Sequence, residues 1–514
     1  MQVRIICILI LFLSSLSVFS QIDLKLANDY FQFGNYENAL KSYEYLYEKD
    51  TTNADVIYKL GVCHLILMKD RSKAVPFLEK ASTMKGVIDF VWFDLGSAYR
   101  YTHQFDKSNE ALTKFLSLTR NSTDKELCEL MLIQNKNAQQ LLKSPHDVEF
   151  INLGSNVNSI YDDFAPYVSR DNEWMFFNSN RIFNKVEDMY IVNVHNVEFK
   201  RNKWRQAGRS KYVNSAEDNV VAGMSASEDI IFVKPMRYTL FGDIISAPIS
   251  DGNISGRSYT LPAPINTRDE ESGATLSPTG DTLIFSSDRK GGEGGLDLYM
   301  SIKLPDNSWG TPQNLGSHIN SKFHEDFPMF SADGKTLWFA SNGPASMGGF
   351  DIFVSKWNAS EGRWSSPRNL GYPINSLYDN LAISYTNNER YAYVSDVRSE
   401  GYGGMDIYQV VFKKEARSIY ILRGIINKGT ASEPILLTDS DLVQIALLDF
   451  DSKDVIGKYK FDYSSNSFFA AIPPGKYILK VESSSCIALE YEFDIADMHA
   501  TEEFEIETLF LNSK

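Results

Sequence analysis

The sequence predicts a multidomain protein of α and all-β parts, with helical repeats at the N-terminus, a five-bladed β-propeller in the middle and a β-sandwich at the C-terminus. Helix-type apolar spacing with a period of about 34 residues predicts the first part, and a strand-type block that recurs about every 54 residues predicts the second. A different rhythm of β-rich segments runs from residue 418 to the end. The 514 residues suit about three domains, and the hydrophobic content of 43% excludes a disordered chain.

Residues 1–20 have the features of a secretory signal peptide. Arg4 supplies positive charge, Ile5 to Phe12 are apolar, and Val18-Phe19-Ser20 places small residues before a cleavage site. We therefore expect the mature chain to begin at Gln21 and to be exported. An uncleaved membrane anchor is the alternative, although the apolar run is shorter than the roughly 20 residues that span a bilayer.

Three cysteines remain after the signal peptide, namely Cys63, Cys128 and Cys486. They are too few and too far apart for a disulfide framework or a C-x-x-C metal site, so we expect buried apolar residues. A disulfide between Cys63 and Cys128 is the alternative, because both lie in the helical region.

Residues 21–145 carry the helical repeat. Leu60-Gly61 recurs as Leu95-Gly96, 96 − 61 = 35 residues later, and Trp92 and Tyr99 flank the second pair. A glycine at this position lets the two helices of a pair approach closely, while the larger side chains fill the seam between pairs. This W-x-x-L-G-x-x-Y pattern resembles the tetratricopeptide repeat, which implies stacked helix pairs and a final covering helix over Asp124 to Leu142.

Residues 147–414 contain one block five times, in which an Asp follows a loop and begins a strand. These aspartates are Asp188, Asp243, Asp297, Asp351 and Asp406, separated by 55, 54, 54 and 55 residues. Four short strands in each block are typical of a propeller blade, so five blocks predict five blades. The segment from Val148 to Gly154 has the ending of a block but no block of its own. We expect it to complete the last blade and so remove an exposed sheet edge.

Two resemblances follow from short motifs. The F-x-S and G-G-x-D pieces of the third and fourth blocks, with the S-x-D-G turn of the fourth, resemble the TolB-type, WD40-like propeller, whereas the first two blocks lack the Gly-Gly pair or the Asp-Gly turn. In residues 418–514, the P-P-G-x-Y turn that ends at Tyr477 resembles the regulatory domain found beside carboxypeptidases, a small β-sandwich.

The sequence predicts no catalytic residue, metal site or cofactor. It contains no G-x-S-x-G element, and none of its seven histidines forms H-E-x-x-H. The Gly-rich run before Asp297 could bind calcium, but similar loops precede Asp351 and Asp406, which favours a structural loop. We therefore expect that the chain is not an enzyme.

One set of carboxylates predicts a binding site. An acidic residue precedes the first strand of each block: Asp163, Asp218, Glu271, Asp326 and Asp379. These strand ends converge on the central channel of a propeller, so a ring of carboxylates there would attract a cation or a basic peptide. The alternative is that each carboxylate caps its own loop by accepting hydrogen bonds from backbone N–H groups.

The order of the three parts resembles the PorE-type periplasmic protein of the type IX secretion system, here without the OmpA-like domain of that family. The resemblance implies a periplasmic, outer-membrane-associated scaffold that binds protein partners of a secretion or gliding assembly. Contact with peptidoglycan and direct membrane insertion are not predicted, and the net charge of −15 argues against nucleic acid as a partner. The alternative function is a propeller protein that binds or processes a carbohydrate or a peptide.

Overall fold

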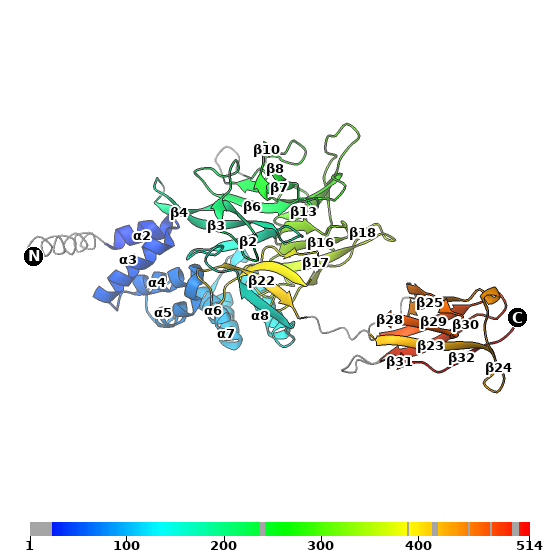
Figure 1. Cartoon of the computed structure of the whole chain (residues 1–514). Coiled ribbons are helices and arrows are strands. Elements are labelled where there is room, and N and C mark those ends of the chain that lie inside the picture. The colour runs from blue at the N-terminus through cyan, green and yellow to red at the C-terminus, as the bar shows by residue number, and fades with distance from the viewer. Residues whose placement is uncertain are drawn as a thin grey trace, which may run out of the picture. The chain divides into compact units, whose positions relative to one another are not determined.

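The computed structural model describes residues 23–186, 188–236, 242–387, 390–413, 420–450, 453–472, 475–495 and 503–514 (Figure 1). It separates into two compact units, Met1–Phe412 and Lys413–Lys514. The chain is mostly β with helices at the N-terminus of the first unit. The predicted signal peptide lies outside the described residues. Within the described ranges, no helix is both long enough and apolar enough to cross a bilayer.

The helices of the first unit follow one another in pairs. They are α2 (Leu24–Gln32) and α3 (Tyr36–Lys49), α4 (Ala54–Ile66) and α5 (Ala74–Ser82), α6 (Val91–Tyr101) and α7 (Phe105–Leu118), and α8 (Ser122–Leu141). A short 3-10 helix, η1 (Met68–Lys73), precedes α5. Asp23, Asn35, Asn53 and Asn121 each stand before a helix and accept a hydrogen bond from a backbone N–H of its first turn, which explains where these helices begin.

The marker residues of the helical repeat lie at close helix contacts. A Cβ atom on Gly61 would lie 2.8 Å from Leu78 Cγ, and one on Gly96 would lie 2.8 Å from Leu112 Cγ. Any larger residue would therefore push the paired helices apart. Leu60, Leu95 and Tyr99 are buried and Trp92 is half-buried. Cys63 and Cys128 are buried free thiols, as is Cys486, so the predicted alternative of a Cys63–Cys128 disulfide is wrong.

The strands of 148–412 form five sheets within the described residues. The first sheet contains β2 (Asp163–Val168), β3 (Trp174–Asn184), β4 (Met189–Glu198) and β5 (Gly208–Arg209), and the second contains β6 (Asn219–Met224), β7 (Ile230–Pro235), β8 (Ile245–Ser250), β9 (Asn253–Ile254) and β10 (Tyr259–Thr260). The third contains β11 (Glu271–Leu276), β12 (Thr282–Ser287), β13 (Asp297–Ile302) and β14 (Gln313–Asn314), and the fourth contains β15 (Glu325–Phe330), β16 (Thr336–Ser341), β17 (Asp351–Asn358), β18 (Arg363–Trp364) and β19 (Arg368–Asn369). The fifth and last sheet contains β20 (Ser384–Tyr385), β21 (Tyr391–Asp396), β22 (Asp406–Phe412) and β1 (Val148–Asn152). Strand β1 pairs antiparallel with β22, with Val148 opposite Phe412, so the first strand completes the last sheet as predicted.

A repeated asparagine joins each sheet to the one before it. The partner residue lies in the third strand of the preceding sheet or just before that strand. The asparagine Nδ2 donates to the backbone carbonyl of this residue, and the asparagine Oδ1 accepts from its backbone N–H, with both distances at 2.8–3.0 Å. The five pairs are Asn158 with Ile407, Asn214 with Val194, Asn266 with Ile244, Asn320 with Leu298 and Asn375 with Ile352. Because Asn158 of the first sheet holds the last sheet, the hydrogen bonds form a closed circuit.

Three of the marker aspartates have the same surroundings. Asp297, Asp351 and Asp406 are fully buried, and each accepts a bond from a backbone N–H of the preceding Gly-rich loop and from an asparagine near the outer edge of the sheet. Asp188 differs, because it lies exposed in the turn of the longer β3–β4 hairpin. In the first sheet, the position equivalent to these three aspartates is held by Asn193, the residue before Val194. The 55-residue spacing between Asp188 and Asp243 therefore does not join equivalent positions of two sheets.

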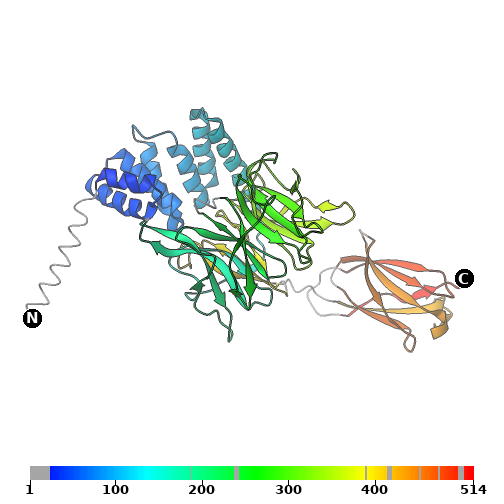
Figure 2. The same ribbon diagram turned by 90° about the horizontal axis from the view of Figure 1, so that it is seen from above.

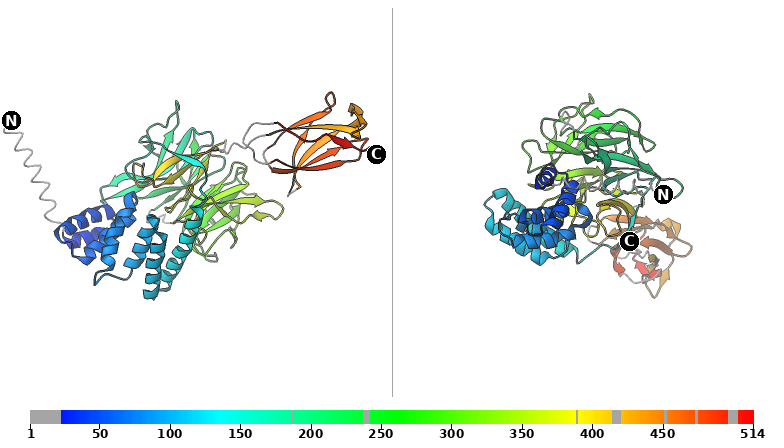
Figure 3. Two further views of the ribbon diagram at one scale, coloured as in Figure 1. Left: turned by 90° about the horizontal axis from the view of Figure 1, so that it is seen from below. Right: turned by 90° about the vertical axis from the view of Figure 1, so that its left-hand side faces the viewer.

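The helices lie against one side of the five sheets (Figure 2), and both views of Figure 3 agree on this. Arg100 of α6 is 5% exposed, and its Nη2 donates to the carbonyls of Met347 and Gly348 at 2.8 Å and to Gln134 Oε1 at 3.1 Å. Asn137 Nδ2 of α8 donates to the Pro344 carbonyl at 2.6 Å. The loop between β16 and β17 is therefore held by two helices through polar contacts, of which those of Arg100 are buried.

The second unit consists of two sheets around one core. One sheet contains β23 (Tyr420–Gly429), β24 (Pro434–Ile435), β27 (Phe461–Asp462), β28 (Ser467–Ile472), β31 (Glu503–Glu505) and β32 (Leu509–Leu511); the other contains β25 (Gln444–Asp449), β26 (Val455–Tyr459), β29 (Gly475–Glu482) and β30 (Leu489–Ile495). Leu422, Phe468, Leu447 and Leu479 contribute to the core from both sheets. The two prolines of the regulatory-domain-like turn lie outside the described residues.

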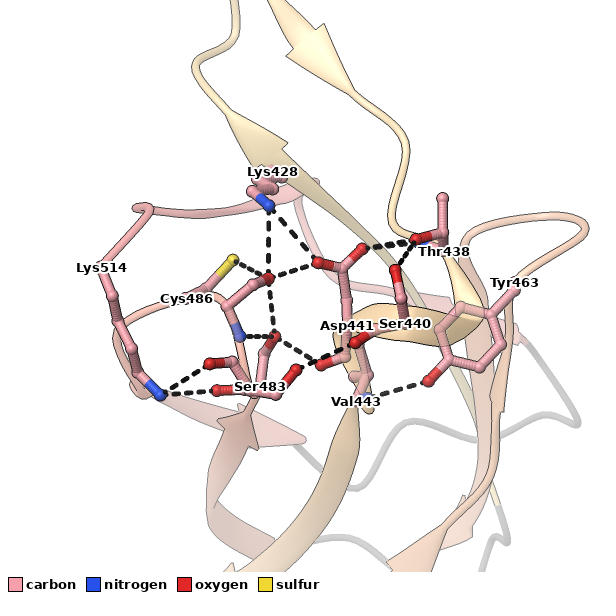
Figure 4. Close-up of polar contacts among 11 residues, drawn as sticks. Lys428, Thr438, Ser440, Asp441, Val443, Tyr463, Ser483, Cys486 and Lys514 are labelled. Atoms are coloured by element: carbon pink, nitrogen blue, oxygen red, sulfur yellow. Dashed lines mark hydrogen bonds and ion pairs between the residues drawn. The ribbon is translucent and has the colours of Figure 1, made fainter.

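A polar cluster fixes one end of this unit (Figure 4). Asp441, in the 3-10 helix η2 (Asp439–Asp441), accepts from Thr438 N at 2.8 Å, from the Ser485 hydroxyl and from Lys428 Nζ at 3.4 Å. These bonds, the Ser485 bond first, lower the pKa of Asp441 to about 2. Lys514 Nζ donates to the Ser483 carbonyl at 3.0 Å, so the cluster ties the last residue of the chain to the loop after β29.

Candidate functional site

The five predicted carboxylates do not form an open ring. Asp163 and Glu271 are fully buried, and each accepts from the backbone N–H and the hydroxyl of the residue four positions earlier and forms an ion pair with an arginine. Asp218 accepts from Val192 N at 2.7 Å and Asp379 from Phe350 N at 2.9 Å. Asp326 accepts from Ser272 Oγ at 2.7 Å and from Gly273 N at 2.9 Å.

The five residues also lie in three different registers. Counting five residues from each linking asparagine gives Asp163, Asn219, Glu271, Glu325 and Asn380, and Asp218, Asp326 and Asp379 are displaced from these positions by one residue. Burial raises the pKa of Asp163 and of Glu325, while hydrogen bonds and, at Asp163, the Arg181 charge oppose it. The contacts of Asp163 and Glu271 match the alternative that each carboxylate caps its own loop. The other three carboxylates accept from backbone N–H groups of the preceding sheet. Binding of a cation or basic peptide by these residues stays a prediction.

A pocket of about 250 Å³ lies where the first strands of four sheets end. We call it the strand-end pocket. Among its lining residues are Arg170 after β2, Glu228 after β6, Asp333 after β15, Tyr385 of β20 and Trp338 of β16. The first strands begin on the helix side, where Tyr161 and Asp162 line a cleft with residues of α3 and α4. The strand-end pocket therefore lies at the end of these strands that the helices leave uncovered.

Glu228 is the residue of this pocket that departs most from the repeat. Its φ is 62°, in the left-handed region, and the same turn position is held elsewhere by Asn172, Gly280 and Gly334, at φ of 63°, 72° and 70°. A glutamate in this conformation costs about 1 kcal/mol relative to glycine. Backbone strain that the repeat avoids elsewhere indicates a functional constraint.

The Glu228 carboxylate is held in place by Arg170. Glu228 Oε1 accepts from Arg170 Nε at 2.7 Å and from Arg170 N at 2.9 Å, so one turn fixes the other across the boundary between two sheets. No other turn of the repeat carries an arginine at the position of Arg170, since Ala226, Pro278, Ala332 and Asn387 stand there. The pair thus belongs to the pocket and not to the repeat.

The rest of the pocket supplies aromatic surface and a second carboxylate. The rings of Trp338 and Tyr385 stack with centroids 5.1 Å apart and an interplanar angle of 29°. Hydrogen bonds from the Ser331 hydroxyl and from Lys335 N lower the pKa of Asp333, so this group is ionised at neutral pH. An aromatic wall with a few fixed polar groups is the usual composition of a ligand site. In the described part of the chain, no cluster of three or more His, Cys, Asp or Glu is placed to hold a metal.

No short motif in the sequence predicts this site, because its residues come from blocks separated by more than 50 residues. One signal is present in the sequence. A serine follows the first strand of each of the first four sheets, at Ser169, Ser225, Ser277 and Ser331, and the residue three positions later is Asn, Glu, Gly and Gly in turn. Of these four residues, only the glutamate is unsuited to the turn.

Comparisons with known proteins give fold-level similarity. No family model and no curated protein matches the chain. A solved glycoside hydrolase is similar at 10% identity over 55% of this chain and 95% of its own, with a TM-score of 0.38. A protein described as a TolB from Agrobacterium tumefaciens is similar at 14% identity over 65% and 97%, with a TM-score of 0.31. An endo-arabinase from Bacteroides thetaiotaomicron is similar at 13% identity over 52% and 99%, with a TM-score of 0.33.

These similarities contradict the prediction that the chain is not an enzyme, because glycoside hydrolases are among the similar structures. The prediction rested on missing motifs, and that ground was inadequate. Hydrolysis of a glycosidic bond needs two carboxyl groups at a suitable separation, and a fold can bring them together from any two parts of a sequence. At these TM-scores the similarity assigns no activity to the chain.

Proposed function

We propose that this is an exported ligand-binding protein in which residues 148–412 form a five-bladed propeller and the N-terminal helices are tetratricopeptide repeats. The strand-end pocket binds a short segment of a carbohydrate or a peptide. The closed circuit of five asparagine links supports the propeller, and the close contacts at Gly61 and Gly96 support the repeats.

The observation that carries the binding function is the strained Glu228 held by Arg170. Glu228 has a left-handed backbone conformation that glycine or asparagine would adopt with less strain, and it lines the same pocket as the aromatic pair. Carboxylates and aromatic faces are suited to hydroxyl and amide groups, which both sugars and peptides present. The volume of about 250 Å³ suits one small unit of such a polymer.

Isothermal titration of the whole protein against panels of oligosaccharides and short peptides tests this proposal. We expect one class to bind, and Glu228→Gln to weaken that binding about tenfold or more, because a charge-assisted contact and the partner of Arg170 are both lost. Chromatography of the same mixtures shows whether the bound ligand is cleaved.

The matched control is Glu173→Gln, an exposed glutamate on a neighbouring turn that does not line the strand-end pocket. It should change the affinity less than about twofold, as surface substitutions usually do. Failure of both panels to bind, or equal binding by Glu228→Gln and the unchanged protein, would refute the proposal.

A second candidate function is that of a scaffold in a cell-envelope assembly, as the resemblance to the PorE-type periplasmic protein implies. The observation in its favour is the buried Arg100 contact that joins helices and sheets into one body able to hold partners at fixed positions. Affinity capture from envelope extracts of the source cells should then recover outer-membrane or secretion components. Their absence, with the bait intact and in the periplasmic fraction, would count against the scaffold.

A further inference from the structure

A second pocket, of about 410 Å³, lies between the third and fourth sheets, and we call it the tryptophan pocket. Its apolar wall includes Trp357 and Trp364, whose rings meet edge to face with centroids 5.4 Å apart, together with Met300 and Ile302. Trp357 is 38% exposed and Ile302 is 54% exposed. Large apolar side chains gathered around a cavity at the surface indicate an interaction site.

The indole N–H of Trp364 has no acceptor, although the side chain is 5% exposed. The repeat shows how this arises. Trp204 is the equivalent residue of the first sheet, and it hydrogen-bonds with the hydroxyl of Tyr393 in the neighbouring fifth sheet. In the third sheet, which neighbours Trp364, the position equivalent to Tyr393 is held by Ile284. Isoleucine has no side-chain oxygen, so it cannot accept the Trp364 N–H. A buried donor without an acceptor is unfavourable, and a ligand that brings an acceptor would remove the deficit.

The charge around the pocket has one sign. Asp281 and Asp333 are exposed and line it, and no lysine, arginine or histidine is among its described lining residues. Hydrogen bonds from neighbouring hydroxyls, of Thr279 and Ser331 first, lower the pKa of both carboxyl groups. A ligand that pairs an apolar group with a positive charge is therefore favoured over an acidic or neutral one.

We propose that the tryptophan pocket docks an extended segment of a partner protein through one large apolar side chain followed by a lysine or arginine, with a backbone carbonyl accepting from Trp364. Aromatic anchors in such pockets contribute most of the binding energy of protein interfaces. The two pockets share Phe330 and Asp333, whereas Ile302, Trp357 and Trp364 line the tryptophan pocket alone. Substitutions at these three residues therefore distinguish a failure of this proposal from a failure of the strand-end pocket.

The test is fluorescence polarisation of labelled peptides with the whole protein, using acetyl-Gly-Phe-Lys-Gly amide and its counterpart with Glu in place of Lys. We expect the lysine peptide to bind about tenfold or more tightly than the glutamate peptide, and Trp357→Ala to weaken it about tenfold or more. Tyr259→Ala, which removes an aromatic side chain that is 67% exposed elsewhere, is the matched control and should leave binding unchanged. Ile302→Ser serves if Trp357→Ala does not fold.

Trp364→Phe removes the unpartnered N–H together with one of the two fused rings of a buried side chain. The lysine peptide should therefore bind more weakly, while the lost volume lowers the unfolding temperature. Equal binding of the two peptides, no binding of either, or an equal loss in Tyr259→Ala would overturn the proposal. Competition by chitin oligosaccharides that Trp357→Ala abolishes would also overturn it, since the pocket would then hold sugar.

Discussion

Replacing Arg100 with methionine is expected to lower the free energy of unfolding of the first unit by about 2–3 kcal/mol, the range for hydrogen bonds made by a charged group whose neutral acceptors are then left without a donor. Methionine fills much of the same volume but donates no hydrogen bond. The carbonyls of Met347 and Gly348 would lose their 2.8 Å donor, and Gln134 Oε1 would lose the N–H group that donates to it. Chemical denaturation followed by circular dichroism measures the loss.

The same substitution has an electrostatic consequence. Burial raises the pKa of Asp351 to about 7, and the Arg100 charge is among the contributions that oppose this rise. Without Arg100 the carboxyl group would be protonated at a higher pH, which adds to the weakening of the Gly-rich loop.

Lys114→Met is the control for this prediction, because Lys114 is an exposed residue of α7 and its loss should change the stability by less than about 0.5 kcal/mol. Limited proteolysis should cleave the Arg100→Met protein near the start of β1 faster than either of the others. If Arg100→Met unfolded at the same denaturant concentration as the unchanged protein, the contact between helices and sheets would not be the one described.

The sequence was sufficient for the features that repeat locally. The glycines at 61 and 96 and the aspartates at 297, 351 and 406 are required by contacts within one helix pair or one loop, so their spacing reports structure directly. The pairing of β1 with β22 also followed from the block order. Asp188 shows that spacing alone can mislead, because this aspartate lies in the turn of a longer hairpin and matches the expected spacing by coincidence.

The sequence also contains a repeat signal that is stronger than the aspartate spacing. Each linking asparagine follows a valine or isoleucine and precedes a serine or threonine: Val157-Asn158-Ser159, Val213-Asn214-Ser215, Ile265-Asn266-Thr267, Ile319-Asn320-Ser321 and Ile374-Asn375-Ser376. Counting from this motif places the capping residues in one register. Counting back from the serine that follows the first strand of each of the first four sheets does not, because these strands contain an irregular register between that serine and the loop.

The two pockets and the helix–sheet contact could not be predicted from local patterns. Arg170 and Glu228 are 58 residues apart, and Arg100 contacts a loop about 250 residues away. Their chemistry depends on which sheets become neighbours, and neither periodicity nor spacing contains that information. The sequence does show which positions depart from the repeat in residue type, and Glu228 and Ile284 are two such positions.

Replacing Asn320 with alanine is expected to cost about 2–4 kcal/mol, because it leaves the buried N–H of Leu298 without a partner and removes one of the two donors to the Leu298 carbonyl, the other being Leu315 N. Asn320 itself is 3% exposed, so water does not readily replace its amide. The loss should appear as a lower midpoint of chemical denaturation with an unchanged slope, as expected when the native state alone is weakened.

Asn158→Ala gives the sharper result, because Asn158 joins the first sheet to the last across the point where the circuit closes. If the circuit is closed in solution, this substitution should cost as much as Asn320→Ala, since the two links are chemically the same. Asn156→Ala, two residues away in the same loop, is the control: Asn156 is exposed and makes one bond to the Trp204 carbonyl, so about 1 kcal/mol or less is expected. A cost for Asn158→Ala no greater than that of the control would mean that the first and last sheets separate freely, and the five sheets would then be an open stack.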